Sequence, residues 1–137
     1  MVIFAFNSIL KKMAINYTIE ADDGLLRVVA AGKDDNLRQV KDYGFAVLSA
    51  ALSSRCTKVL CDERELIYSL GTFDSFESAK YISELAPDIA KVAIVCRPEN
   101  IEDADFWETV AVNRGLHVRV FKTLAEAENW LKKAECP

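Results

Sequence analysis

The spacing of hydrophobic residues changes several times along the chain, and each change predicts a strand or a helix. Every second residue is apolar between positions 15 and 20, which is typical of a half-buried strand. Residues 22–24 (Asp-Asp-Gly) then carry a hairpin-turn signal, and the apolar run over 25–31 supplies the returning strand. We therefore expect the fold to open with an antiparallel hairpin.

Apolar residues next recur at helical spacing, and this pattern predicts a first helix over residues 37–53. Gly44 lies inside that helix at a cost of about 1 kcal/mol relative to alanine, and a close approach of the helix to the sheet would explain it. Strand and helix patterns then alternate to the C-terminus. The further predicted elements are a strand over 57–61, a helix from about 72 to 85, a strand over 91–96, a helix over 102–114, a strand over 117–121 and a helix over 124–134. An aspartate of residues 34–35 is expected to cap the first helix, and Thr72 or Asp74 the second. Thr123 and Glu126 are expected to form a capping box at the start of the last helix.

The element order β-β-α-β-α-β-α-β-α predicts an α/β fold. Right-handed crossovers between successive parallel strands place helices on both sides of a sheet. We therefore expect a mixed five-stranded sheet, with an antiparallel first strand and otherwise parallel strands, and four helices on both faces. No repeat, linker or low-complexity segment divides residues 15–137, so they are expected to form a single domain.

Residues 1–14 are expected to be an N-terminal extension of that domain. An apolar stretch over residues 2–6 precedes Lys11 and Lys12, whereas a signal peptide places its positive charges before its apolar stretch. Met13 is a second candidate start of the protein. Alternatively, the extension is a short strand or helix that docks on the domain or on a second copy of the chain.

Composition narrows the class of protein. The 137 residues are 51% hydrophobic and 28% charged, which is ordinary for a soluble globular domain. The formal net charge of −4 argues against nucleic acid, which selects basic faces, and suits a cytoplasmic protein. No apolar run reaches the roughly 20 residues that span a bilayer, so no membrane span is expected.

The cysteines do not form a metal-binding pattern. No Cys-x-x-Cys pair occurs, and the single histidine, His117, cannot complete a zinc set at the usual spacings. We expect reduced, buried thiols, no metal, no cofactor and no enzymatic activity. The alternative is an enzyme that uses Cys61 or Cys96, because both lie near the ends of strands. The four cysteines are Cys56, Cys61, Cys96 and Cys136.

The best place for a binding site is the edge of the sheet where the parallel strands end, because ligands of such folds bind there. Charged residues follow the strands at this edge, and helix N-termini point toward it. The alternative is that these charges are solvated and that Arg64 or Arg97 pairs with a neighbouring carboxylate. The candidate residues for binding a protein partner or a small ligand are Asp62, Glu63, Arg64, Arg97, Thr72, Phe106 and Trp107.

Several segments together resemble the SpoIIAA-like branch of the STAS family, a branch that is also similar to the lipid-binding Sec14 fold. The resemblance extends over residues 15–133 and implies a STAS-like domain with a regulatory, non-enzymatic function, as in anti-sigma-factor antagonists. The segments are Val59-Leu60-Cys61-Asp62-Glu63-Arg64-Glu65, Thr72-Phe73-Asp74, Lys91-Val92-Ala93-Ile94-Val95-Cys96, residues 106–115 (FWETVAVNRG), 118–121 (VRVF) and 125–131 (AEAENWL).

The resemblance also implies a phosphorylation site. In the antagonists of this family, a serine at the N-terminus of the helix after the third strand is phosphorylated by a partner kinase. Carried over, the loop is residues 62–71 and the helix starts near Thr72. The usual Asp-Ser-Ser-Gly-like motif is absent, so the candidate phosphorylation sites are the nearby hydroxyls of Ser69, Thr72 and Ser75.

The likeness to Sec14 implies an alternative function, the binding of a lipid or an apolar small molecule. The side chains expected to line its cavity are Phe73, Phe76, Phe106 and Trp107. A homodimer is also possible, because the apolar N-terminal arm could pair with a second chain. The expected partners are therefore a protein, a small molecule or a lipid, and a second copy of the chain.

Overall fold

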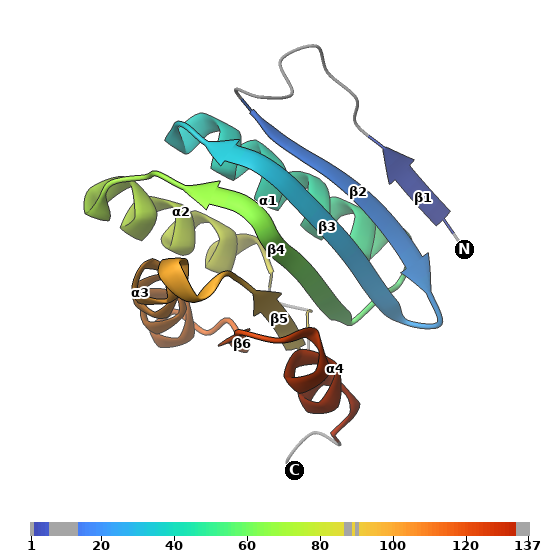
Figure 1. The fold of residues 1–137 in the computed structure, drawn as a ribbon. Coiled ribbons are helices and arrows are strands. Elements are labelled where there is room, and N and C mark those ends of the chain that lie inside the picture. The colour runs from blue at the N-terminus through green and yellow to red at the C-terminus, as the bar shows by residue number, and fades with distance from the viewer. Residues whose placement is uncertain (1, 6–13, 87–88, 90, 134–137) are drawn as a thin grey trace.

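The strands of the computed structural model form one sheet, and helices cover both of its faces (Figure 1). The structure describes residues 2–5, 14–86, 89 and 91–133 of the chain. Within them, six strands lie side by side in chain order: β1 (Val2–Ala5), β2 (Ile15–Asp22), β3 (Leu25–Asp34), β4 (Lys58–Tyr68), β5 (Lys91–Val95) and β6 (Val118–Phe121). The helices of the same residues are α1 (Leu37–Ser53), α2 (Thr72–Leu85), the short 3-10 turn η1 (Pro98–Asn100), α3 (Ile101–Asn113) and α4 (Leu124–Lys132).

The directions of the strands confirm the predicted mixed sheet. Strand β2 is antiparallel to both β1 and β3, whereas β3, β4, β5 and β6 are parallel to one another. The five predicted strands are present, and β1 adds a sixth at the antiparallel edge. This strand comes from the segment expected to be an N-terminal extension. Residues 6–13, which include Lys11 and Met13, lie outside the described residues.

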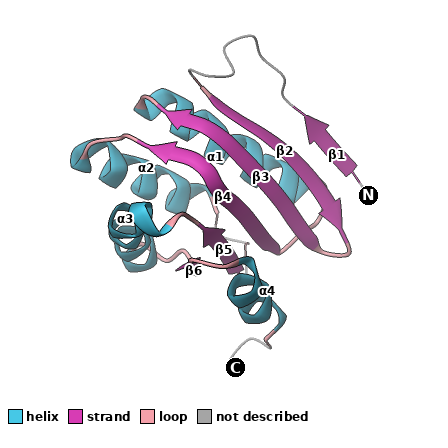
Figure 2. Ribbon diagram, viewed as in Figure 1, coloured by secondary structure: helices cyan, strands magenta, loops and turns pink. Residues whose placement is uncertain are grey.

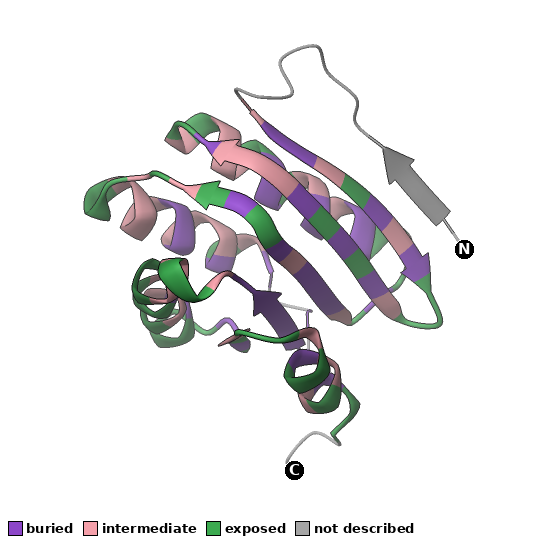
Figure 3. Ribbon diagram, viewed as in Figure 1, coloured by how far each residue is buried: buried purple, intermediate pink, exposed green. Residues whose placement is uncertain are grey.

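Helices lie on both faces of the sheet (Figure 2), and a hydrophobic cluster on each face holds them there. Ile19, Leu26 and Val28 belong to the larger cluster, together with buried residues of α1, α2 and α3. Leu60 and Val95 belong to the smaller cluster, under α4. Strand β5 is buried along its whole length, in keeping with its near-continuous apolar sequence (Figure 3). No helix of the described residues is long and apolar enough to cross a bilayer.

Gly44 lets α1 approach α2 rather than the sheet, which corrects the predicted reason for this glycine. A Cβ atom on Gly44 would lie 2.5 Å from Cδ1 and 2.7 Å from Cγ1 of Ile82 in α2. Side-chain carbon atoms cannot pack that closely without moving. A glycine that is unfavourable for an isolated helix therefore allows the two helices to pack tightly.

The helix ends follow local rules, with two differences from the prediction. Thr123 and Glu126 form the expected capping box at the start of α4. Asn36, rather than an aspartate of residues 34–35, caps α1, because its Oδ1 accepts a hydrogen bond from the Gln39 amide. Helix α2 has Gly71 as its N-cap, so Thr72 is its first residue rather than its cap.

Strands β3 and β4 are both longer than predicted, and this changes the position of the candidate site. β3 continues to Asp34 and β4 to Tyr68. The predicted loop over residues 62–71 is therefore wrong for its first seven residues, which belong to β4. Charged residues occur there because part of this stretch is open to solvent, and the pairing of β4 with β5 ends at Asp62.

Candidate functional site

A β-bulge in β4 sets the direction of the side chains at the site. Val29 of β3 pairs with Asp62 and Ala31 pairs with Glu65, so β4 carries one residue more than β3 between these pairs. Side chains alternate along a regular strand, and an extra residue reverses the alternation beyond it. As a result Glu63 and Tyr68, five positions apart, both line the same cavity, on the side of the sheet that α1, α2 and α3 cover.

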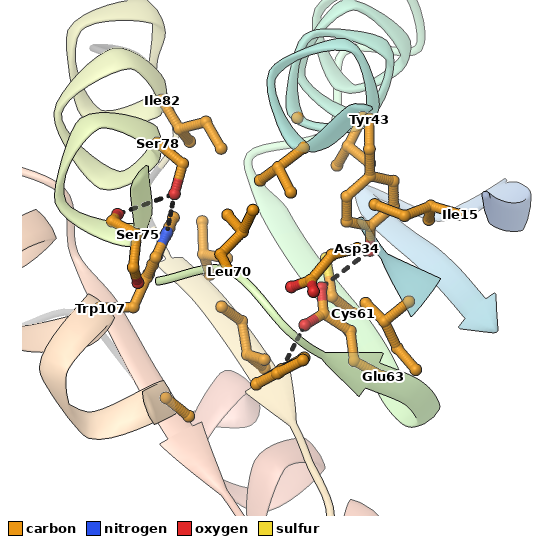
Figure 4. Close-up of a pocket in the computed structure, with 18 of the residues that line it drawn as sticks. Ile15, Asp34, Tyr43, Cys61, Glu63, Leu70, Ser75, Ser78, Ile82 and Trp107 are labelled. Carbon is orange, nitrogen blue, oxygen red and sulfur yellow. Dashed lines mark hydrogen bonds between the residues drawn. The ribbon is translucent and has the colours of Figure 1, made fainter. Parts of the chain in front are cut away.

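This cavity lies between the sheet and helices α1, α2 and α3, and its volume is about 120 Å³. Most of its wall is apolar, with contributions from Val47 of α1, Ile82 of α2 and Ile94 of β5. Figure 4 shows Glu63 and Tyr43 on one side of the hollow, and Trp107 and Ser78 on the other. The cavity is therefore a hydrophobic space with polar groups at a few defined positions, a lining of the kind found in small-molecule sites.

Glu63 is the central polar group of the cavity. Glu63 is buried, and its two carboxylate oxygens accept hydrogen bonds from the hydroxyls of Tyr43 (2.9 Å) and Tyr68 (2.5 Å). Burial raises the pKa of Glu63, and the two hydroxyl donors offset only part of that rise. Burial, with the nearby carboxylate, also raises the pKa of both tyrosines, so each phenol keeps its proton and remains a donor.

A second carboxylate, Asp34, ends β3 beside this group. The Ser69 amide donates a hydrogen bond to its Oδ1, and the Ser69 hydroxyl lies 2.9 Å from the Asp34 carbonyl oxygen. Burial is the main cause that raises the pKa of Asp34, and the charge of Asp103 in α3 adds to it. Asp34 likewise raises the pKa of Glu63. Asp34 therefore interacts electrostatically with both Glu63 and Asp103, and all three residues line the cavity.

The opposite wall is fixed by a hydrogen bond between two helices. The indole Nε1–H of Trp107 donates to the hydroxyl oxygen of Ser78, at 2.9 Å, and that hydroxyl donates to the Ser75 carbonyl oxygen, at 2.8 Å. Ser78 is fully buried, so both of its contacts are protected from water. This chain of bonds holds α3 against α2 and sets the shape of the cavity on that side.

The other charged residues of β4 lie on the opposite face of the sheet. Arg64 forms a bidentate ion pair with Asp62, in which Nε lies 2.8 Å from Oδ1 and Nη2 lies 2.8 Å from Oδ2. This contact lowers the pKa of Asp62. Arg97 donates from Nε to the Arg64 carbonyl oxygen at 2.6 Å, and its Nη2 lies 3.7 Å from Glu65. We call Asp62, Arg64, Glu65 and Arg97 the strand-end cluster.

The sequence-based candidates are thus divided between two places. Glu63 and Trp107 line the cavity, whereas Asp62, Arg64 and Arg97 form part of the strand-end cluster. Phe106 and Thr72 are exposed, on α3 and at the start of α2 respectively. The cavity also contains polar residues that were not among the candidates, including Asp34, Tyr43, Tyr68, Ser78 and Asp103.

The three candidate phosphorylation sites differ in their surroundings. Ser69 is exposed, but its amide and hydroxyl both contact Asp34. Ser75 is only partly exposed and lines the cavity. Thr72 is exposed and has no hydrogen bond from its hydroxyl to any of the described residues. Of the three hydroxyls, that of Thr72 is the most accessible to another protein.

The aromatic residues expected to line a lipid cavity are mostly elsewhere. Only Trp107 of the four does so among the described residues. Phe73 is 73% exposed and Phe106 is 37% exposed, and Phe76 packs its ring under the guanidinium of Arg114. The prediction of a cavity lined by these phenylalanines is therefore wrong, and aliphatic and tyrosine side chains form most of the wall instead.

The described thiols are buried and free. Cys61 and Cys96 are 6% and 0% exposed, and Cys56 is buried as well; Cys136 lies outside the described residues. Burial is the main cause that raises the pKa of Cys61, and it raises the pKa of Cys96 to about 11. A nucleophilic cysteine needs a lowered pKa, so that its thiol is ionised. The surroundings of Cys61 and Cys96 therefore disfavour the thiol enzyme.

Comparisons with known proteins identify the fold. No protein-family model matches the sequence, and no curated protein matches it. Among solved structures, an anti-sigma factor antagonist from Mycobacterium paratuberculosis aligns with a TM-score of 0.61 and 15% identity, over 88% of this chain and 96% of that one. An uncharacterised protein with a SpoIIAA-like fold from Shewanella loihica aligns with a TM-score of 0.52 and 22% identity, over 86% of this chain and 94% of that one. The chain therefore has the SpoIIAA-like fold.

Proposed function

We propose that this SpoIIAA-like chain is a non-enzymatic regulatory module that binds a protein partner at the edge where β4 and β5 end. The observation that carries the proposal is apolar exposure at that edge: Ile67 near the end of β4 is 48% exposed, and Phe73 in the first turn of α2 is 73% exposed. Large apolar side chains near charged groups are typical of protein interfaces. The strand-end cluster supplies those charged groups.

The chemistry of the chain supports a binding function over catalysis. Glu63 is held between two phenols, and Asp34 is bonded to Ser69. The thiols that would act as nucleophiles are buried, with raised pKa values. The free cysteines also suit the reducing cytoplasm, where we propose that the chain acts.

We further propose that the partner is an anti-sigma factor, because one solved structure of the same fold is an anti-sigma factor antagonist. Binding would be controlled at Thr72. This residue is the first of α2, and its Gly71 N-cap provides no side-chain acceptor for the amides of the first turn. A phosphate on Thr72 would accept hydrogen bonds from those amides. It would also add negative charge beside Phe73 and so oppose docking of the partner there.

The cavity argues against the lipid-carrier alternative. Its volume of about 120 Å³ is well below the roughly 300–1,000 Å³ of usual ligand pockets. A long acyl chain would therefore require α1 and α2 to separate. Their close contact at Gly44 and Ile82 opposes that movement.

The test is a titration of the purified chain with the anti-sigma factors encoded in the same genome. We expect Arg64→Glu and Phe73→Ser each to weaken binding by about tenfold or more, as substitutions at interface anchors do. Thr72→Glu should weaken it as well. Arg55→Glu, which follows α1 at the other end of the molecule, is the matched control and should bind normally. Unchanged binding in Arg64→Glu and Phe73→Ser would reject this surface, and failure of every anti-sigma factor to bind would reject the partner class.

A further inference from the structure

We propose that the cavity between the sheet and helices α1, α2 and α3 is a binding site for a small organic cation, an amine whose apolar body is about as large as a benzene ring. This site is separate from the proposed partner surface. Asp62 and Arg64 of the strand-end cluster lie on the opposite face of the sheet from Glu63. The inference therefore does not depend on the identity of a protein partner.

The size of the cavity selects the body of the ligand. Its volume of about 120 Å³ is close to that of engineered apolar cavities of about 150 Å³, which stay dry and bind benzene. The wall is mainly aliphatic and aromatic, including Val47, Ile94 and Trp107. A single ring or a short branched alkyl group fills such a space without moving the helices.

The charge of the lining selects the head of the ligand. In the described part of the chain, acidic side chains line the cavity and basic side chains do not. The acidic residues are Asp34 of β3, Glu63 of β4 and Asp103 of α3. None of the three forms an ion pair among those residues. Asp34 and Glu63 are buried, and a buried carboxylate without a positive partner is costly. A ligand ammonium would supply the missing positive charge.

Two other ligand classes fit less well. An anion would face three carboxyl groups, and no basic side chain of the described residues lines the cavity. A metal ion needs several ligands at about 2–2.6 Å, and the described residues contain no group of three or more His, Cys, Asp or Glu side chains arranged to hold one. The carboxyl groups, from β3, β4 and α3, instead border an apolar space, as an ammonium joined to a ring would require.

Four single-ring probes that differ only in their polar group test the inference: benzylamine, benzyl alcohol, benzoate and toluene. Binding is measured by chemical-shift changes in two-dimensional amide NMR spectra and by the shift in melting temperature. Benzylamine should bind at least about tenfold more tightly than benzyl alcohol, the difference that one favourable charge contact gives, and benzoate should not bind. Equal binding of benzylamine and benzyl alcohol would overturn the assignment of a cation, and binding of none of the four would overturn the site.

Two variants locate the charge. Glu63→Gln should weaken benzylamine binding by about tenfold or more without weakening toluene binding. Asp62→Asn, the neighbouring residue on the other face, is the matched control and should leave benzylamine binding unchanged. Should Glu63→Gln fail to fold, Asp103→Asn at an exposed position provides the same test. Normal benzylamine affinity in Glu63→Gln, or in Asp103→Asn where Glu63→Gln does not fold, would reject the proposed recognition.

Discussion

The ammonium group of Lys91 donates a hydrogen bond to the carbonyl oxygen of Trp130, at 2.9 Å, and lies 5.1 Å from the centre of the Trp130 ring. The same group donates to the Lys133 carbonyl oxygen at 2.8 Å, and Lys58 Nζ donates to that of Leu131 at 2.7 Å. Two lysines at the starts of β4 and β5 thus bind the C-terminal carbonyl groups of α4. Positive charge is favourable at that end of a helix.

This contact predicts that Lys91→Met will destabilise the protein. The lysine is 3% exposed, and methionine would fill the same space but leave the two carbonyl groups without their donor. Hydrogen bonds to charged groups contribute about 1.5–3 kcal/mol each. Because methionine also avoids the cost of burying the ammonium charge, we expect the free energy of unfolding in urea to fall by only about 2–3 kcal/mol. Lys132→Met, at an exposed position of the same helix, is the control and should change it by less than about 0.5 kcal/mol. Equal effects would show that the carbonyl contacts contribute nothing.

Gly32→Ala should be among the most damaging alanine substitutions in the sheet. Gly32 has a φ of +102°, and a Cβ atom there would lie 2.1 Å from the Ala14 carbonyl oxygen. The strained backbone and the clash with a main-chain atom together predict a loss of about 3 kcal/mol in the free energy of unfolding. Gly24 also has a positive φ, but no atom lies within 4 Å of a Cβ placed there. Gly24→Ala therefore has the backbone strain without the clash, and its free energy of unfolding should fall by only about 1 kcal/mol. A similar loss in both variants would contradict the role of Ala14.

The buried carboxyl of Glu63 predicts a pH dependence of stability. Its pKa is raised in the folded state, so the folded chain holds this proton to a higher pH than the unfolded chain does. Stability from this source is therefore present at low pH and is lost as pH rises through the folded pKa, which lies above the usual carboxyl value, so the free energy of unfolding in urea should fall as the pH rises through that range. Glu63→Gln should reduce this slope, and the raised pKa of Asp34 should leave a smaller slope of the same sign.

Glu65→Gln is the control for that measurement. The Glu65 side chain is 76% exposed and lies two positions along the same strand. Its replacement should keep the wild-type slope. A Glu63→Gln protein whose stability varies with pH as strongly as the wild type would show that the buried carboxyl is not responsible.

The burial of the thiols predicts slow modification in the native state. In a Cys136→Ser background, Cys56, Cys61 and Cys96 should react with a disulfide reagent at least about a hundredfold more slowly in buffer than in urea, because both access and thiolate are lacking. The absorbance of the released thiol follows the reaction. Rapid reaction of one thiol in buffer would restore the nucleophilic cysteine as a possibility.

Local patterns were sufficient to predict most of the elements. The first helix was predicted over 37–53 and observed at Leu37–Ser53, because its apolar positions and its flanking turns are close in sequence. The capping box at Thr123 and Glu126 was predicted correctly for the same reason. The failure over residues 62–68 has a tertiary cause. The polar side chains of residues 62–68 are typical of a loop. Their backbone nevertheless continues to pair with β3, whereas the pairing with β5 on the other side ends at Asp62.

The cavity could not be predicted because its polar residues come from distant segments. Asp34, Tyr43 and Glu63 belong to β3, α1 and β4, and each has an ordinary explanation within its own segment. Tyr43 occurs at helical spacing and reads as a core residue. One signal was available: a tyrosine on a buried helix face needs a partner for its hydroxyl. The sequence could not show that the partner is Glu63.

The additional residue in β4 makes the length of this strand as important as its composition. A protein of the same topology that lacked the extra residue between Asp62 and Glu65 would have a regular strand there, and its acid and phenol would share the cavity face at a spacing of four positions instead of five. When relatives of this chain are compared, a gap-free match through this strand would equate positions on opposite sides of the sheet. The spacing of the acid and the phenol, five positions with the bulge and four without it, is thus expected to identify the relatives that keep this pair.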